Sequence, residues 1–305
     1  LNLKPDLSIN ISSQSSPTSQ LSSGKRAEPL TRDPLIGSSV GQFNILEKIG
    51  WGGQATVYKA RQQPLNRIVA IKMFPKKALN SDTRQLRLFE REVTAGTSLQ
   101  HPHILPVYAN GQDDTYFYIV MGYLSGGTLA QKLSHNASNL TDIETPLSQI
   151  AQALDYIHQF GIIHRDVKPS NIMFDEKGNA YLTDFSSAFF SQGDYEEEVV
   201  VGSPAYISPE QALGKMPKRQ SDIYSLGITL FEWVTRQTPY QSENVIALLG
   251  KHIQEPMPSI RQIRKDVSQA VEDVILKATD KNPDQRFQSA GELAQAFSVA
   301  LRKNK

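Results

Sequence analysis

The residues of this chain that could do chemistry lie in two short segments, His164-Arg165-Asp166-Val167-Lys168-Pro169-Ser170-Asn171 and Asp184-Phe185. Asp166 is a candidate base and Lys168 a cation, while Asn171 and Asp184 offer the oxygen ligands that Mg²⁺ prefers. Phosphoryl transfer needs these parts, because its catalysis consists mostly of positioning and of neutralising charge around an anion. A lone aspartate is usually a polar loop residue, whereas this ordered set predicts phosphoryl transfer.

The elements that must position these residues fall into two parts. Strand-like alternation covers 43–49, 56–61, 67–74 and 116–123, and helical periodicity covers 81–99. After Gly126-Gly127 helical periodicity dominates, in residues 147–160, 222–236, 244–254, 267–279 and 289–302. A strand-rich part of about 80 residues followed by a helical part of about 180 predicts an α+β arrangement of two lobes, with the active-site cleft between them.

Composition narrows the classes of function. The hydrophobic content of 39% supports a sizeable core, and the net charge of +1 does not favour nucleic acid or an anionic membrane as partner. The absence of cysteine excludes disulfides, thiol chemistry and cysteine-ligated zinc, and fits a reducing cytosol. No apolar run approaches the roughly 18 residues that cross a bilayer. We therefore expect a soluble, cytoplasmic protein, although the chain begins at Leu1 rather than Met and further segments could lie outside it.

Residues 1–38 differ in kind from the rest. Eight serines fall in the first 25 positions, and four prolines are scattered among few large apolar residues. Such a segment cannot bury enough apolar surface to offset its chain entropy. It is predicted to be a disordered, serine-rich tail.

A glycine-rich turn, Gly50-Trp51-Gly52-Gly53-Gln54-Ala55-Thr56-Val57, follows the first strand. Glycines bend the backbone sharply and bring N–H groups close to phosphate oxygens. The motif alone is also compatible with a plain hairpin. A dinucleotide-binding turn would need a helix after the glycines, whereas Thr56 begins another strand. The turn therefore favours a phosphate cradle in a sheet.

A lysine and a glutamate on neighbouring elements are a candidate ion pair. Alternation places Ala70 and Lys72 on one face of their strand. Glu92 shares the apolar helix face with Leu88 and Ala95, where an unpaired carboxylate is costly. Lys72 is its natural partner, and Glu90, on another face, is the alternative.

Taken together, these motifs resemble serine/threonine protein kinases, and the resemblance covers residues 43–302. Gly202-Ser203-Pro204-Ala205-Tyr206 and Ser208-Pro209-Glu210 match the segment that docks protein substrate, and the second is similar to the bacterial branch. The resemblance implies a two-lobed protein-kinase domain at 39–303. Its N-lobe (41–122) would be an antiparallel sheet with one main helix, and its C-lobe (125–303) mainly helical.

The resemblance also implies roles for individual residues. Asp166, Lys168, Lys72 and Glu92 would be catalytic, and Asn171 and Asp184 would bind Mg²⁺, with Mn²⁺ as an alternative ion. Protein substrates and ATP are the implied partners, with a dimer for autophosphorylation as an option. The residues implied to contact ATP are Ile49, Gly50, Trp51, Gly52, Gly53, Gln54, Ala55, Val57, Ala70, Lys72, Met121, Gly122, Tyr123, Leu124 and Met173.

Three features bear on regulation and architecture. Arg165 is placed to receive an activation-loop phosphate, yet residues 187–202 contain no threonine. Either the acidic run Glu196, Glu197 and Glu198 supplies the anion for Arg165, or it forms a solvated loop. Ser203 is a further regulatory candidate. Glu210 is expected to pair with Arg286, and Asp222 to cap a helix and brace the catalytic loop.

Ser186 departs from the family, which has glycine after Asp-Phe. A side chain there restricts the backbone, so we expect fewer flipped conformers, and equal or higher activity in Ser186→Gly. We therefore expect an ATP- and magnesium-dependent serine/threonine kinase. The alternatives are a pseudokinase scaffold and a small-molecule kinase on the same fold.

Overall fold

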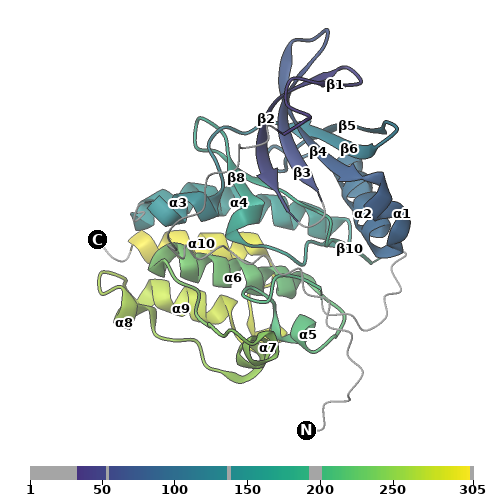
Figure 1. Cartoon of the computed structure of the whole chain (residues 1–305). Coiled ribbons are helices and arrows are strands. Elements are labelled where there is room, and N and C mark those ends of the chain that lie inside the picture. The colour runs from purple at the N-terminus through teal and green to yellow at the C-terminus, as the bar shows by residue number, and fades with distance from the viewer. Residues whose placement is uncertain (1–32, 53–54, 136–138, 192–200, 303–305) are drawn as a thin grey trace, which may run out of the picture. The chain divides into compact units, whose positions relative to one another are not determined.

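The computed structural model describes residues 33–52, 55–135, 139–191 and 201–302. They form two compact units (Figure 1). The sheet unit contains residues 33–52, 55–97 and 106–123. The helical unit contains residues 98–105, 124–135, 139–191 and 201–302.

Six strands build the sheet unit, in the spatial order β1-β2-β3-β4-β6-β5, and every neighbouring pair is antiparallel. The strands are β1 (Ser39–Val40), β2 (Phe43–Trp51), β3 (Thr56–Gln62), β4 (Arg67–Pro75), β5 (Val107–Gln112) and β6 (Tyr116–Gly122). Two helices, α1 (Lys76–Ser81) and α2 (Thr83–Ser98), connect β4 to β5.

Successive side chains of β4 point to opposite faces of the sheet, and each face packs in a different hydrophobic cluster. Val69, Ile71 and Met73 are buried in one cluster with Phe43 and other residues of β2 and β3. The residues between them point to the opposite face, because successive side chains of a strand alternate. On that face Phe74 packs edge-on against Phe89 of α2. Lys72 therefore shares a face with the helix.

Helix α2 approaches the sheet closely at Gly96. A Cβ built on this residue would lie 2.3 Å from the side chain of Val107 on β5, so any side chain at position 96 would force Val107 to shift. Phe89, Glu92, Ala95 and Gly96 form the buried stripe of the helix. Their spacing is that of one helical face, so Glu92 is turned inward.

Residues 33–38, which the sequence assigns to the tail, make defined contacts with the sheet. The Ser38 carbonyl accepts from Ile45 N–H (2.9 Å), and Leu35 packs against the core. Tyr58 donates to Asp33 (3.0 Å); burial, followed by this bond, raises the pKa of Tyr58 to about 12. The boundary expected at residue 38 is thus placed too late, because backbone bonds to Ile45, the packing of Leu35 and the bond from Tyr58 to Asp33 tie residues 33–38 to β2 and β3. Residues 1–32 of the expected tail lie outside the described residues.

The helical unit contains eight α-helices in its described part, two 3₁₀ turns and two small antiparallel strand pairs, β7 with β10 and β8 with β9. Its strands are β7 (Ile162–Ile163), β8 (Ile172–Phe174), β9 (Ala180–Leu182) and β10 (Phe189–Phe190), and its 3₁₀ turns are η1 (Pro169–Asn171) and η2 (Pro283–Gln285). Its helices are α3 (Leu129–His135), α4 (Leu140–Gln159), α5 (Pro209–Ala212), α6 (Arg219–Thr235), α7 (Val245–Gln254), α8 (Ile260–Ile263), α9 (Gln269–Ala278) and α10 (Ala290–Arg302).

Helix α6 is the centre of the helical unit. Nearly all its residues from Ser221 onward are buried, as expected of a helix surrounded by other elements. It contacts α4 and α9, and α10 packs along α4 (Figure 1). Within the described ranges, no helix combines the length and apolarity needed to span a membrane. The predicted α+β class, with an antiparallel-sheet part and a mainly helical part, is confirmed.

Candidate active site

The carboxylate of Asp166 is the centre of a hydrogen-bonded cluster in the helical unit. Its Oδ2 accepts from the Asn171 side-chain amide (3.1 Å) and lies 2.8 Å from Lys168 Nζ. Its Oδ1 accepts from the backbone N–H of Ser203 (2.9 Å). Lys168 Nζ also donates to the Ser203 hydroxyl (2.6 Å). Four residues predicted from sequence are thus joined, and three donors contact the Asp166 carboxylate.

The backbone around Asp166 is fixed by a buried carboxylate. Asp222, which is 0% exposed, accepts from the N–H groups of His164 (2.9 Å) and Arg165 (2.8 Å). Its Oδ2 also lies 2.8 Å from His158 Nε2. The expected brace is confirmed. The expectation that Asp222 also caps the helix is wrong, because α6 begins three residues earlier, at Arg219.

The two predicted metal ligands lie on segments that are bonded together. Thr183 donates its N–H to the Asn171 carbonyl (3.0 Å), and Asp184 follows Thr183 directly. The amide nitrogen of Asn171 donates to the Asp166 carbonyl (2.9 Å) and carboxylate, so its amide oxygen, which accepts from the Ser170 hydroxyl at 3.4 Å, is the atom that would bind a metal. One carboxylate and one amide oxygen, completed by phosphate oxygens and water, suit Mg²⁺. The donor set therefore fits the implied ion.

Gln211 is a site residue that sequence reasoning missed. It is buried at 4% exposure, and its side-chain amide donates to the carbonyls of Arg165 and Val201, both at 3.1 Å. It also shares a reciprocal capping box with Ser208 at the start of α5. Gln211 thus links the loop that contains Arg165 and Asp166 to the segment that contains Val201 and Ser203. The capping pattern Ser-Pro-Glu-Gln was the only signal for it.

Arg165 has a partner that the sequence did not indicate. Its Nε donates to the Ser187 carbonyl (2.6 Å), and its guanidinium lies 5.6 Å from the centre of the Phe189 ring. Glu196, Glu197 and Glu198, the proposed anions for Arg165, lie outside the described residues. Their role stays a prediction. Ser203, the other regulatory candidate, sits in the Asp166 cluster.

In the sheet unit, Lys72 and Glu92 form the predicted ion pair. Lys72 Nζ lies 2.7 Å from both carboxylate oxygens of Glu92, whose side chain is 8% exposed. Glu90 is exposed, so the alternative partner is excluded. An unpaired charge at the Glu92 position would be strongly destabilising. The contact is confirmed, while the catalytic roles of both residues stay predictions.

The glycine-rich turn is described except at Gly53 and Gln54. Gly50 pairs with Val57 and Val57 with Lys72, so the turn is registered directly on the lysine strand. Trp51 is 81% exposed, and Lys48 Nζ lies 5.7 Å from its ring centre. Ile49 and Gly52 are also exposed, whereas Ala55 packs against the sheet core.

The remaining residues expected to contact adenine lie on strands β4, β6 and β8 and directly after β6. Ala70 is opposite Met121, and Tyr123 carries Lys59 Nζ 4.9 Å from its ring centre. The N–H of Gly122 already donates to the Pro106 carbonyl (3.0 Å), so an adenine bound here would have to use other backbone groups of this stretch. Leu124 and Met173 belong to the helical unit and are half-buried. Adenine binding by all of these residues stays a prediction.

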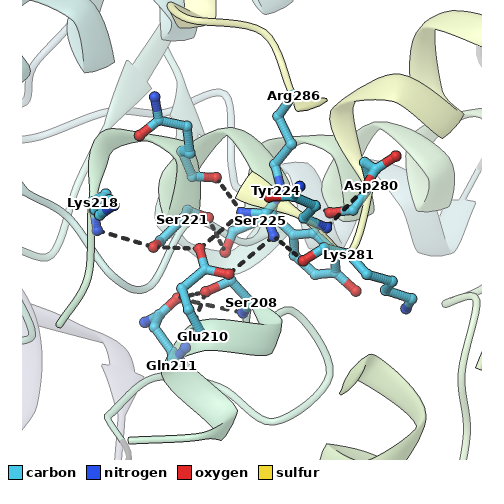
Figure 2. A network of polar contacts seen from close by, with 12 residues as sticks. Ser208, Glu210, Gln211, Lys218, Ser221, Tyr224, Ser225, Asp280, Lys281 and Arg286 are labelled. Atoms are coloured by element: carbon cyan, nitrogen blue, oxygen red, sulfur yellow. Dashed lines mark hydrogen bonds and ion pairs between the residues drawn. The ribbon is translucent and has the colours of Figure 1, made fainter. Parts of the chain in front are cut away.

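A buried network supports the segment after Ser203 (Figure 2). Arg286 is paired with Glu210 through two hydrogen bonds, as the sequence predicts, and Ser221 donates to Glu210 at 2.6 Å. Burial by itself raises the pKa of Glu210, but the bonds and charge of Arg286 outweigh it and hold the pKa below its ordinary value. The network joins α5, α6 and the residues after η2.

Comparisons with known proteins point to one family. The protein kinase domain family model matches residues 43–297. The chain is 40% identical over 271 residues to the serine/threonine-protein kinase PrkC of Bacillus subtilis, covering 88% of this chain and 42% of that protein.

Two further relatives have similar coverage. The probable serine/threonine-protein kinase PknB of Lactococcus lactis is 38% identical over 257 residues, covering 83% of this chain and 41% of that protein. PknB of Mycolicibacterium smegmatis is 36% identical over 264 residues, covering 83% and 42%. The chain thus spans less than half the length of these relatives.

Proposed function

Because this chain belongs to the protein kinase domain family, we propose that it transfers the γ-phosphate of ATP to serine and threonine hydroxyls of proteins. The observation that carries the proposal is the Asp166 cluster, in which Lys168, Asn171 and Ser203 all contact one carboxylate. The names of the relatives, all serine/threonine-protein kinases, support the same reaction. Proteins are the proposed substrates.

Asp166 is the proposed base and orienting group. Among the described residues, its Oδ1 accepts only the Ser203 N–H, which leaves a lone pair for a substrate hydroxyl. The hydroxyl oxygen forms a bond to the γ-phosphorus as the bond to the β-phosphate oxygen breaks. ADP leaves, and the hydroxyl proton passes to Asp166.

Lys168 and Ser203 are proposed to serve the same step. Lys168 Nζ, held by Asp166 and by the Ser203 hydroxyl, places a positive charge beside the base. That charge would stabilise the negative charge of the transferring phosphoryl group. The bond between Lys168 and Ser203 joins the two motifs, 168–171 and 202–206, that resemble serine/threonine kinases. It therefore supports a preference for serine and threonine over tyrosine.

Lys72 and Glu92 are proposed to position the α- and β-phosphates of ATP. The ion pair holds the ammonium at 2.7 Å from both carboxylate oxygens and so fixes its place beside the glycine-rich turn. Asn171 and Asp184 are proposed to hold Mg²⁺, which when bound would neutralise phosphate charge. Mn²⁺ presents similar ligand demands and is proposed as a substitute. The cytoplasmic location stays a proposal that rests on the need for ATP, and a dimer for autophosphorylation stays a prediction.

The test is phosphate transfer by the pure chain. Radiolabelled ATP is offered with a generic basic protein, and the labelled product is hydrolysed to its phosphoamino acids. We expect phosphoserine and phosphothreonine, with negligible phosphotyrosine. Nucleotide binding without any transfer would indicate a pseudokinase, label on a small molecule alone would indicate a different kinase class, and predominant phosphotyrosine would overturn the proposed selectivity.

A further inference from the structure

Ser186 lies directly after the Asp184-Phe185 pair, at the position where the family resemblance calls for glycine. Its hydroxyl donates to Oδ1 of Asp184 at 2.7 Å, and its backbone N–H approaches the same oxygen at 3.3 Å. A hydroxyl bond to a carboxylate is charge-assisted and stronger than a bond between neutral groups. The side chain therefore makes a contact that glycine cannot make.

The residues on both sides of Ser186 are held in place. Phe185 is 4% exposed and its ring meets the His164 ring edge-on, with centres 5.0 Å apart. On the other side, the Ser187 carbonyl accepts from Arg165. Ser186 is thus attached to a fixed backbone, so its hydroxyl is presented to Asp184 at low entropic cost.

Asp184 is the residue that needs such support. Its φ of 63° lies in the left-handed region, which costs a non-glycine residue free energy. The bond from Ser186 also restricts the rotamers of the Asp184 carboxylate before a cation binds. Cation binding by the other carboxylate oxygen then costs less side-chain entropy.

We propose that Ser186 is a positioning residue that holds the Asp184 carboxylate ready for the divalent cation of the metal–nucleotide complex. The inference rests on the proposed function, because that function assigns the cation to Asp184 and Asn171. It reverses the expectation from sequence that glycine at 186 would keep or raise activity. The hydroxyl, rather than the restriction of the backbone, is the feature that matters.

Three variants separate the hydroxyl from the backbone effect. Ser186→Ala keeps the Cβ and removes the hydroxyl, Ser186→Gly removes both, and Ser186→Thr keeps the hydroxyl. Mn²⁺ binding in the presence of ADP, followed by electron paramagnetic resonance, reads the site without any phosphate transfer. We expect the alanine and glycine variants to bind Mn²⁺ about tenfold more weakly than wild type, the loss typical when a group that orients a metal ligand is removed. The threonine variant should bind within about twofold of wild type, because it retains the donor.

The outcomes distinguish this inference from the proposed function. If alanine matches wild type, or only glycine differs, the hydroxyl has no positioning role and the inference is overturned. If wild type itself binds no Mn²⁺ with ADP, the proposed function fails first. Thermal melting without metal and nucleotide is the folding control. A threonine variant that melts like wild type but binds as weakly as alanine would also contradict the inference.

Discussion

Arg286 holds both carboxylate oxygens of Glu210, with Nη1 2.8 Å from Oε1 and Nη2 2.9 Å from Oε2. The Arg286 side chain is fully buried and that of Glu210 is 8% exposed. The residues are 76 positions apart in sequence, so the pair fastens α5 to the region after η2. Such a pair is costly to break, because the remaining charge stays buried.

Arg286→Met should therefore lower the free energy of unfolding by roughly 3–5 kcal/mol. The control is Asp266→Asn, which breaks the pair between Arg264 and an Asp266 side chain that is 66% exposed, and which should cost about 0–1 kcal/mol. Urea unfolding of both variants beside wild type provides the comparison. An Arg286→Met variant no less stable than Asp266→Asn would show that the buried pair is not structural.

The ion pair of the sheet unit is expected to matter for turnover. Lys72→Met should reduce the rate of phosphate transfer severely, since it removes the proposed phosphate contact and leaves Glu92 buried without its cation. Glu92→Gln should act in the same direction but partially, whereas Glu90→Gln, at an exposed position of the same helix, should change little. Steady-state rates at saturating ATP measure this. Greater sensitivity at Glu90 than at Glu92 would contradict the assigned pair.

The strongly periodic helices were predictable and the short elements were not. The expected helix 289–302 differs from α10 (Ala290–Arg302) by one residue. Helix α4 begins at Leu140, seven residues before its predicted start. The predicted start is too late because a proline such as Pro146 usually marks a helix boundary, whereas here it lies inside the helix. Strand β5 (Val107–Gln112) was missed since its sequence, VYANGQ, holds few β-branched residues.

The candidate site shows the same division. Motifs at fixed spacing identified the Asp166 cluster and, through helix periodicity, the Lys72–Glu92 pair. Gln211 and the Ser186 hydroxyl bond escaped, because the partners of a polar side chain depend on its three-dimensional surroundings. The bond from Gln211 to Arg165, for example, spans 46 positions of sequence.

His252 makes the stability of the helical unit sensitive to acid. Burial, followed by the charge of Lys281, lowers the pKa of His252 from 6.5 to about 3. Between these values the unfolded chain binds a proton that the folded chain does not, so stability present above pH 6.5 is lost as the pH falls. The loss attributable to His252 at about pH 5 is roughly 2 kcal/mol.

Urea unfolding at about pH 7.5 and about pH 5 tests this coupling. The fall in unfolding free energy between the two pH values should be smaller in His252→Gln than in wild type by about that 2 kcal/mol. His135→Gln, at an exposed position on α3, is the control and should keep the fall of wild type. An identical fall in the His252 variant would contradict the assignment.

The acidic run Glu196-Glu197-Glu198 is expected to stand in partly for an activating phosphate. A carboxylate contact to Arg165 contributes roughly 1.5–3 kcal/mol when shielded and much less when exposed. The triple glutamine variant, assayed after phosphatase treatment, should therefore be less active than treated wild type. If treated wild type is inactive, or if the variant equals it, the run is a solvated loop, and activation falls to Ser187, Ser191, Ser203 or a partner.

The most direct test of the account replaces the proposed base. Asp166→Asn preserves the size of the side chain but removes the carboxylate that orients and deprotonates the substrate hydroxyl. Transfer of radiolabelled phosphate should fall below about one hundredth of wild type, measured side by side, because loss of a positioned base typically costs two to four orders of magnitude. Binding of ATP, measured separately, should persist, since Asp166 is assigned to the hydroxyl and not to the nucleotide. Transfer above one hundredth of the wild-type rate by a folded Asp166→Asn variant would contradict the assigned mechanism.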